Sequence, residues 1–167
     1  MQFAPLAEAQ LPQLCAMLAL ACPFDSPSLD LLREKTFGDP DQRSQDCLVA
    51  WEGQSMAGYC QFLWRLRPGG LRQGYIKLLA VAPQYRRQGL ASRLMELAES
   101  TLREQGVAVV RLLESYPNYL CPGLDVRYTP AILLLEKLAY SKVSETYNLH
   151  CPLETLFHEE QVQRRLQ

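Results

Sequence analysis

The chain has 167 residues, a length typical of a single globular domain that buries roughly two thirds of its unfolded surface. Its formal net charge is −1, so its overall electrostatics do not favour binding to nucleic acid or to an anionic membrane. The six cysteines include no CxxC pair, and both histidines lie near the end of the chain. Zinc-binding spacing is therefore absent, and we expect no metal site.

The apolar stretch LPQLCAMLALACPF near the start resembles neither a signal peptide nor a membrane span. No basic side chain precedes it, and it is too short to cross a bilayer. The scattered cysteines are typical of small apolar core residues in a reducing compartment. We therefore expect a cytoplasmic protein.

Two helices are predicted in the first part of the chain. The apolar residues between Leu11 and Leu18 recur at helical spacing, and Pro12 suits a first helical turn. A second helix is expected from Ser26 to Gly38, before the polar loop GDPDQRSQD.

Three strands are predicted next, at CLVAW (47–51), AGYCQFLWRLR (57–67) and YIKLLAV (75–81). The third is almost entirely apolar and is therefore expected at the centre of a sheet. A helix with apolar residues at four-residue steps follows from Leu90, and Gly106 suits its C-terminal cap.

The remaining elements are a buried strand at VAVVRLL, a proline- and tyrosine-containing loop at 115–128, a helix from Thr129 to Leu138, and final strands within 141–153. This order predicts a mixed α/β sheet with helices on both faces. We expect one domain over residues 1–153, followed by a tail or helix at 154–167.

The stretch LAVAPQYRRQGLASRL joins a buried strand to an amphipathic helix. The backbone amides of residues 87–90 fall at the helix start, where N–H groups lack intrahelical partners and the helix dipole is positive. Gly89 has no Cβ to prevent close approach, and Arg86 and Arg87 add positive charge. The pattern predicts a site for a phosphorylated ligand. The alternative is that the arginines solvate a helix end and Gly89 eases a turn.

These residues carry a family resemblance. The segment from Arg86 to Ala91 resembles the [R/Q]xxGx[G/A] loop of GNAT-superfamily N-acetyltransferases, and LLAVAPQYRRQGLASRLMELAE resembles that family's strand 4 and helix 3. The stretch AILLLEKLAY is similar to the family's AxxLYEKxGF helix. The resemblance implies a mostly antiparallel mixed sheet that splays between strands 4 and 5, and it covers most of the chain.

The resemblance also implies acetyl-CoA as co-substrate, with no metal. The pyrophosphate is expected on the backbone of the loop, and the pantetheine arm on the free edge of strand 4. The loop residues are Arg86, Arg87, Gln88, Gly89, Leu90 and Ala91, and the strand residues are Leu79, Ala80 and Val81. Transfer of an acetyl group to a primary amine, on a small molecule or a peptide, is the expected reaction.

Three positions depart from the family pattern. Leu135 stands where a tyrosine often protonates the departing thiolate, Tyr128 aligns with an asparagine, and Ala139 aligns with a glycine. A thiol with a pKa near ~8.5 leaves without much acid assistance, so Leu135 is compatible with transfer. A rival interpretation is an acyl-CoA-binding module that has lost its chemistry.

Residues for proton transfer and acceptor binding are expected after the strand at 107–113. Glu114 is the candidate base, or else a solvated charge at a strand end. Tyr128 is a candidate catalytic hydroxyl, or else lines a pocket. Tyr119 and Asp125 are expected to contact the acceptor, although Asp125 also suits a turn and the loop also suits a structural plug. Lys77 faces either the substrate or a sheet edge.

The loop PNYLCPGLDVRYTPAI resembles a segment of GNAT members built from two tandem domains. The tail HEEQVQRRLQ is accordingly either the remnant of a connector or a helix that packs on a partner subunit in a homodimer. Nucleic-acid binding through Arg86, Arg87 and Tyr85 has little support at this net charge.

Overall fold

A computed structural model describes residues 1–147 of the protein. A five-stranded sheet and four α-helices make up the fold. The strands are β1 (Gln2–Pro5), β2 (Cys47–Glu52), β3 (Ser55–Leu66), β4 (Arg72–Val81) and β5 (Val109–Leu112), and the helices are α1 (Leu11–Ala21), α2 (Leu29–Lys35), α3 (Leu90–Glu104) and α4 (Thr129–Lys137). Within residues 1–147, no helix has both the length and the apolar character that a membrane span requires.

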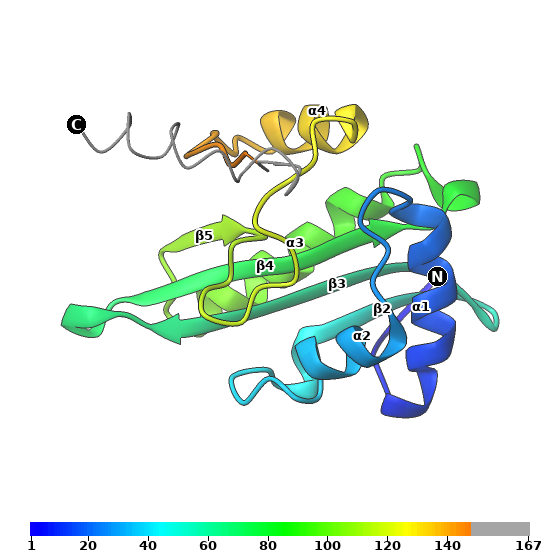
Figure 1. The fold of residues 1–167 in the computed structure, drawn as a ribbon, viewed down its shortest axis with the longest axis horizontal. Coiled ribbons are helices and arrows are strands. Elements are labelled where there is room, and N and C mark those ends of the chain that lie inside the picture. The colour runs from blue at the N-terminus through cyan, green and yellow to red at the C-terminus, as the bar shows by residue number, and fades with distance from the viewer. Residues whose placement is uncertain (148–167) are drawn as a thin grey trace, which may run out of the picture.

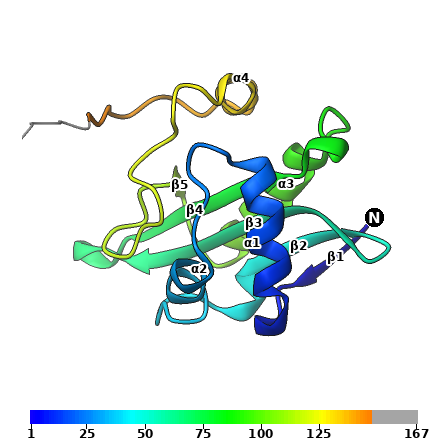
Figure 2. The ribbon, with the colours of Figure 1, turned by 45° about the vertical axis from the view of Figure 1, so that its right-hand side comes forward.

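The strands follow one another across the sheet in sequence order, from β1 to β5. The first three pairings are antiparallel and the last, between β4 and β5, is parallel. The connection through α3 places β5 parallel to β4, as a strand–helix–strand unit requires. Figures 1 and 2 show α1 and α2 on one face of the sheet and α3 on the other. The predicted fold class is confirmed, while β1 is a strand that the sequence analysis missed.

Each face of the sheet has its own hydrophobic core, because side chains alternate between the faces along each strand. One core joins the sheet to α1 and α2 and includes Leu14, Leu18 and Tyr59. The other joins the sheet to α3 and includes Cys60, Phe62 and Leu94. The helix predicted from Leu90 is confirmed, and Gly106 follows its last turn in the left-handed conformation, with φ 76°.

β4 and β5 are paired over a short length only. Their pairs begin with Gln73 opposite Val109 and end with Ile76 opposite Leu112, whereas β4 continues to Val81. The two strands therefore separate after Ile76, as the family resemblance implied. Past this point, β4 keeps β3 as its neighbour on one side and has no strand on the other, within the described part of the chain.

The segment after α4 differs from the prediction. Residues 141–147 form no strand and are exposed, so the strands predicted there are wrong; residues 148–153 lie outside the described residues. The physical reason is that SKVSETY carries few apolar side chains, and its two large ones, Val143 and Tyr147, remain 70% and 78% exposed. α4 is anchored instead by Leu135 and Leu138, which pack on the α3 core, and by Tyr140, whose hydroxyl donates to Glu99 Oε1 at 2.8 Å.

Ala139, at the end of α4, generates a stability prediction. Its φ is 62°, a left-handed conformation that costs an L-residue with a Cβ roughly 1–2 kcal/mol. We expect Ala139→Gly to raise the free energy of unfolding by about 1 kcal/mol, measured by urea denaturation. Ala131→Gly, inside α4, is the control and should lower it by about 1 kcal/mol. Equal destabilisation by both changes would contradict the assignment.

Candidate active site

The loop between β4 and α3 ends in a helix start that no side chain caps. Gly89 is the N-cap of α3, with φ 80°, and a Cβ built on it would meet nothing within 4 Å. Intrahelical bonding begins with the Arg93 amide, which donates to the Gly89 carbonyl at 3.0 Å. The amides of the first turn consequently face open space at the positive end of a 15-residue helix. Free amides at the positive end of a helix are typical of an anion-binding site.

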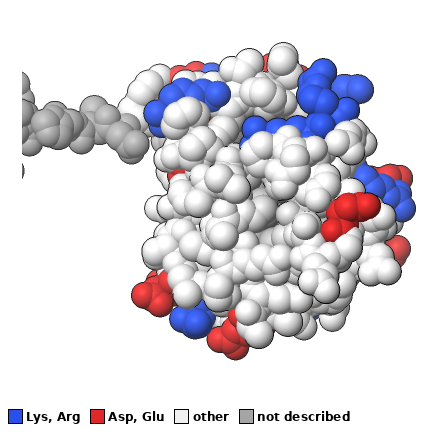
Figure 3. All heavy atoms as spheres, turned by 90° about the vertical axis from the view of Figure 1, so that its right-hand side faces the viewer, with Lys and Arg blue, Asp and Glu red and all other residues white. Residues whose placement is uncertain are grey.

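Arg87 contributes a second left-handed residue to the same loop, with φ 62°. Its side chain is exposed, and no ion pair or side-chain hydrogen bond engages it among residues 1–147. Figure 3 faces the end of the molecule where this loop lies and shows Lys and Arg atoms gathered along its upper part, above a broad neutral area. Arg86 and Arg87 themselves give the loop two exposed residues with positive charge.

Arg86 is oriented differently from Arg87. Its Nε donates to the Val81 carbonyl at 3.1 Å and its Nη2 to the Ala21 carbonyl at 2.9 Å. Its guanidinium therefore ties the end of β4 to the C-terminal end of α1. Gln88 likewise turns to the protein and donates to the Gln84 carbonyl. Of the three side chains, Arg87 is the one left to meet a ligand directly.

The free edge of β4 leads directly into this loop. Leu79, Ala80 and Val81 lie opposite β3 residues on one side, and the side toward β5 carries no strand because β5 has already diverged. Side chains of this segment alternate between the two cores, so what the free edge offers is backbone. The predicted pantetheine segment and the predicted pyrophosphate loop thus form one continuous surface.

A buried ion cluster lies beside the start of the free edge. Lys77 is fully buried and donates to Asp39 Oδ2 at 2.6 Å and to the Lys35 carbonyl at 2.6 Å. Arg65 donates to the same Asp39 oxygen at 2.9 Å, and to Asp41 Oδ2 at 2.6 Å. Lys77 is therefore at neither the substrate surface nor a sheet edge, the two positions that the sequence analysis considered.

For both Lys77 and Asp39, burial and pairing shift the pKa in opposite directions. Burial lowers the pKa of Lys77, and the hydrogen bond that Lys77 donates to Asp39 acts in the opposite direction. For Asp39, burial alone raises the pKa, but the hydrogen bonds from Lys77 and the Asp41 amide together bring it below its usual value. Sequence reasoning missed Asp39 and Arg65, although the alternation in β3 places Arg65 on the opposite face from Cys60 and Phe62.

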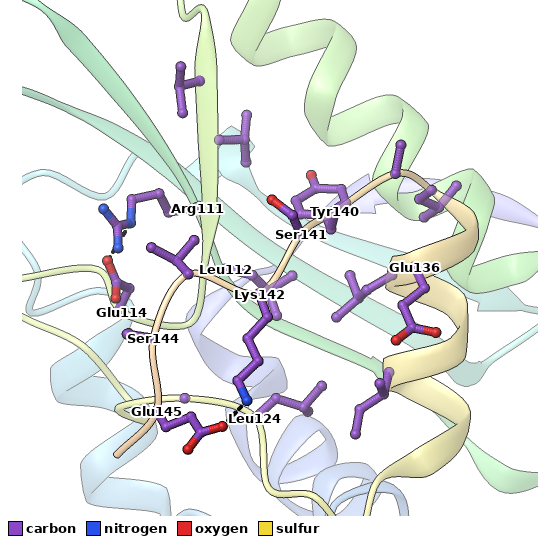
Figure 4. Close-up of a pocket in the computed structure, with 18 of the residues that line it drawn as sticks. Arg111, Leu112, Glu114, Leu124, Glu136, Tyr140, Ser141, Lys142, Ser144 and Glu145 are labelled. Carbon is purple, nitrogen blue, oxygen red and sulfur yellow. Dashed lines mark hydrogen bonds and ion pairs between the residues drawn. The ribbon is translucent and has the colours of Figure 1, made fainter.

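Glu114, the candidate base, follows β5 and forms an ion pair with Arg111. Figure 4 shows both side chains beside a cavity of about 1050 Å³ between β5, α4 and the segment after α4. Leu112 and Leu135 also line this cavity. The carboxylate is half-exposed and paired, so its role as a base remains a prediction.

Asp125 is tied to its own turn. The Arg127 amide and Nε donate to Asp125 Oδ1 at 2.8 and 2.9 Å, and Nη2 donates to Oδ2 at 2.6 Å. These contacts lower the pKa of Asp125 to about 2. Asp125 therefore forms the turn that the sequence analysis considered, and its carboxylate is paired with the Arg127 guanidinium. Tyr119, in contrast, is 45% exposed, next to Leu120, which packs on the α1–α2 core.

Tyr128 holds the end of this loop against the connection between α1 and α2. The Phe24 amide donates to the Tyr128 hydroxyl at 2.9 Å, and the two rings lie 5.1 Å apart. Arg127 adds a cation–π contact, with Cζ 3.9 Å from the centre of the Phe24 ring. Burial raises the pKa of Tyr128, so its hydroxyl is protonated at neutral pH.

The five cysteines of the described region are all free thiols. Burial raises the pKa of Cys22, Cys47 and Cys121 to about 11 and that of Cys60 further. Within residues 1–147, no three His, Cys, Asp or Glu side chains are close enough together to hold a metal ion.

Comparison with known proteins supports this interpretation of the fold. Residues 11–119 match the model of the acetyltransferase (GNAT) family. No curated protein matches the sequence. Several solved structures resemble it.

A ribosomal-protein-alanine N-acetyltransferase from Brucella melitensis biovar Abortus 2308 superposes with TM-score 0.64 at 17% identity, over 90% of this chain and 100% of that one. The aminoglycoside 6'-N-acetyltransferase of Acinetobacter haemolyticus gives TM-score 0.64 at 15% identity, over 92% and 99%. A glucosamine N-acetyltransferase region of a fungal multi-domain GH3 enzyme gives 0.71 at 22%, over 81% of this chain and 16% of that one. At these identities the likeness establishes the fold.

The contrast between Arg86 and Arg87 predicts different effects on stability. Arg86→Met removes two hydrogen bonds from a charged donor to backbone carbonyls, and because the site is exposed we expect a loss of about 1 kcal/mol in the free energy of unfolding. Arg87→Met has no such contacts to lose and should stay within about 0.5 kcal/mol of the parent. Urea denaturation of both variants is the measurement, and an equal loss in both would show that Arg86 is not a tether.

Proposed function

Because this chain belongs to the acetyltransferase (GNAT) family, we propose that it transfers an acetyl group from acetyl-CoA to a primary amine. The observation that carries the proposal is the uncapped start of α3 at Gly89, directly continuous with a strand edge that has no neighbour. Acetyl-CoA supplies the thioester that is cleaved. The cytoplasm is the proposed compartment, consistent with free cysteines.

The loop fits a pyrophosphate. Left-handed backbone at Arg87 and Gly89 turns successive amides outward, and the open space at the missing Gly89 Cβ allows an anion to approach them. Arg87 supplies full positive charge from an exposed side chain, and the helix dipole adds to it. Amides of residues 87–91 are proposed to hold the two phosphates, because the Arg86 amide already donates to the Pro83 carbonyl.

The free edge of β4 is proposed to hold the pantetheine arm as an added strand, through backbone groups of Leu79, Ala80 and Val81. An amide near Leu79 or Ala80 would donate to the oxygen that gains negative charge when the amine attacks. Both roles use backbone alone, which is consistent with the apolar side chains in this segment.

The acceptor must lose a proton before it attacks, because an alkylammonium titrates near ~10. We propose Glu114, on the chain that leaves β5, as the group that receives this proton, directly or through water. Tyr128, protonated at neutral pH, is proposed as a hydrogen-bond donor near the departing thiolate. Since that thiolate leaves readily, Leu135 in place of a tyrosine does not prevent transfer.

The acceptor is proposed to be an amine of a small molecule or a peptide. The three similar structures carry names with different acceptors: alanine of a ribosomal protein, an aminoglycoside and glucosamine. For this chain, we propose that the loop of residues 115–128 forms one wall of the acceptor site, with Tyr119 exposed toward it.

Binding of coenzyme A on the loop is tested by a matched pair of changes at Gly89. Gly89→Asp places a negative charge beside the proposed pyrophosphate and should raise the Kd more than 100-fold, measured by isothermal titration calorimetry. Gly89→Asn has the same shape, tolerates left-handed backbone and should raise the Kd less than 10-fold. Equal affinities in the two folded variants would place the pyrophosphate elsewhere. A parent that binds coenzyme A but acetylates no amine in a labelled panel would be the non-catalytic module instead.

The acceptor-site wall is tested at two neighbouring residues. Tyr119→Ala should raise the acceptor KM or lower kcat, while coenzyme A affinity and Tm change little, because the side chain is exposed. Leu120→Ala is the control: this side chain packs on the α1–α2 core, so its loss should lower Tm and leave acceptor preference unchanged. A fall in Tm with unaltered acceptor kinetics in Tyr119→Ala would mean that the loop is a structural plug.

A further inference from the structure

One extra residue in β4 lies where β4 separates from β5. Gln61 of β3 is opposite Leu78, and its neighbour Phe62 is opposite Ile76, so Lys77 has no residue opposite to it. The last pair between β4 and β5 is Ile76 with Leu112, one residue before the bulge. The bulge therefore marks the start of the free edge.

The bulge also changes which way the following side chains point. Leu78 packs in the α1–α2 core, and Lys77, directly before it, points to the same face and reaches Asp39. Two consecutive side chains on one face break the strict alternation of a strand. A one-residue slip that removed the bulge would move residues 78–81 to the opposite faces and redirect their backbone groups. The bulge at Lys77 thus determines which backbone groups of residues 78–81 face the free edge.

The ion cluster joins the two sides of the opening between β4 and β5. On one side, Lys77 of β4 donates to Asp39. On the other side, Arg65 donates from Nη2 to the same carboxylate and from Nη1 to the Ser115 carbonyl at 2.7 Å, on the chain that has left β5. Asp39 and Ser115 are both buried, with 3% and 0% exposed. The separation of the two chain segments is therefore set by directional, buried hydrogen bonds.

Stability alone does not account for such a cluster. The cost of removing two cations and a carboxylate from water is comparable to their mutual attraction, and apolar side chains of similar volume commonly stabilise a core as well or better. Directional contacts do provide one defined arrangement. That arrangement fixes the position of the bulge at Lys77 relative to the chain at Ser115.

We propose that Lys77, paired with Asp39 and Arg65, is a positioning residue for acetyl transfer: it fixes the bulge of β4 and so aims the free strand edge at the thioester. The role rests on the proposed transferase function. Lys77 does not contact the substrates; it acts through the backbone of residues 78–81. A displacement of about 1 Å at a reacting centre can cost roughly 100-fold in rate, so small movements of this edge would be visible in kcat.

The test compares three variants of the full chain with the parent. Lys77→Met removes the charge and every donor, and Lys77→Gln keeps an N–H donor for Asp39. Arg33→Met is the control and removes two exposed ion pairs, with Glu8 and with Asp30. We measure coenzyme A affinity, kcat with an amine found active for the parent, and the ¹⁵N amide shifts of residues 78–81. Assays run well below the Tm of each variant.

We expect Lys77→Met to lower kcat about 100-fold and Lys77→Gln about 10-fold, with coenzyme A Kd within threefold of the parent. The amide shifts of residues 78–81 should move in both, and Arg33→Met should match the parent throughout. If Lys77→Met does not fold, the 10-fold loss in Lys77→Gln decides the matter. Parental kcat in a folded Lys77 variant would overturn the positioning role alone, whereas a parent without transferase activity would overturn it together with the proposed function.

Discussion

β4 is ten residues long and its parallel neighbour β5 only four, and the proposed cofactor surface depends on this difference. A parallel strand pair normally satisfies its backbone groups along its whole length. Here the pairing stops at Ile76, and the rest of β4 runs on beside β3 alone before turning into α3. The helix start and the unpaired edge are therefore parts of one surface, because the same chain passes from one to the other within a few residues.

Much of this arrangement could be predicted from the sequence because it depends on local patterns. The strand–turn–helix around Gly89, the apolar face of α3 and the four main strands follow from periodicity and from glycine and proline placement. The contact of Lys77 with Asp39 could not be predicted, since the two residues are 38 positions apart and Asp39 lies in a loop that looks like an ordinary polar turn. The orientation of Arg86 toward Ala21 likewise depends on where α1 ends in space. The residues after α4 were misjudged because strands were expected within 141–153, whereas the described part, 141–147, carries too few apolar side chains to join the sheet.

Among residues 1–147, three residues with a Cβ adopt left-handed backbone, and they occur at the boundaries of the proposed site. Arg87 lies in the loop before α3, Leu113 follows the last β4–β5 pair, and Ala139 ends α4. Such conformations cost energy and persist where the surrounding contacts require them. Leu113 shows the constraint directly, because its amide still donates to the Ile76 carbonyl at 2.8 Å while the chain turns away from β4. The strain is located where the chain changes direction around the opening.

The reactivity of the cysteine thiols matters for this protein, because the proposed acyl donor is a thioester. A thiolate attacks a thioester readily, so an accessible ionised cysteine near the opening would acetylate itself. Burial raises the pKa of Cys22, Cys47 and Cys121 to about 11, which leaves roughly one thiol in ten thousand ionised at pH 7. These three cysteines serve as small apolar residues, and at neutral pH their thiols would be poor nucleophiles toward the proposed acyl donor.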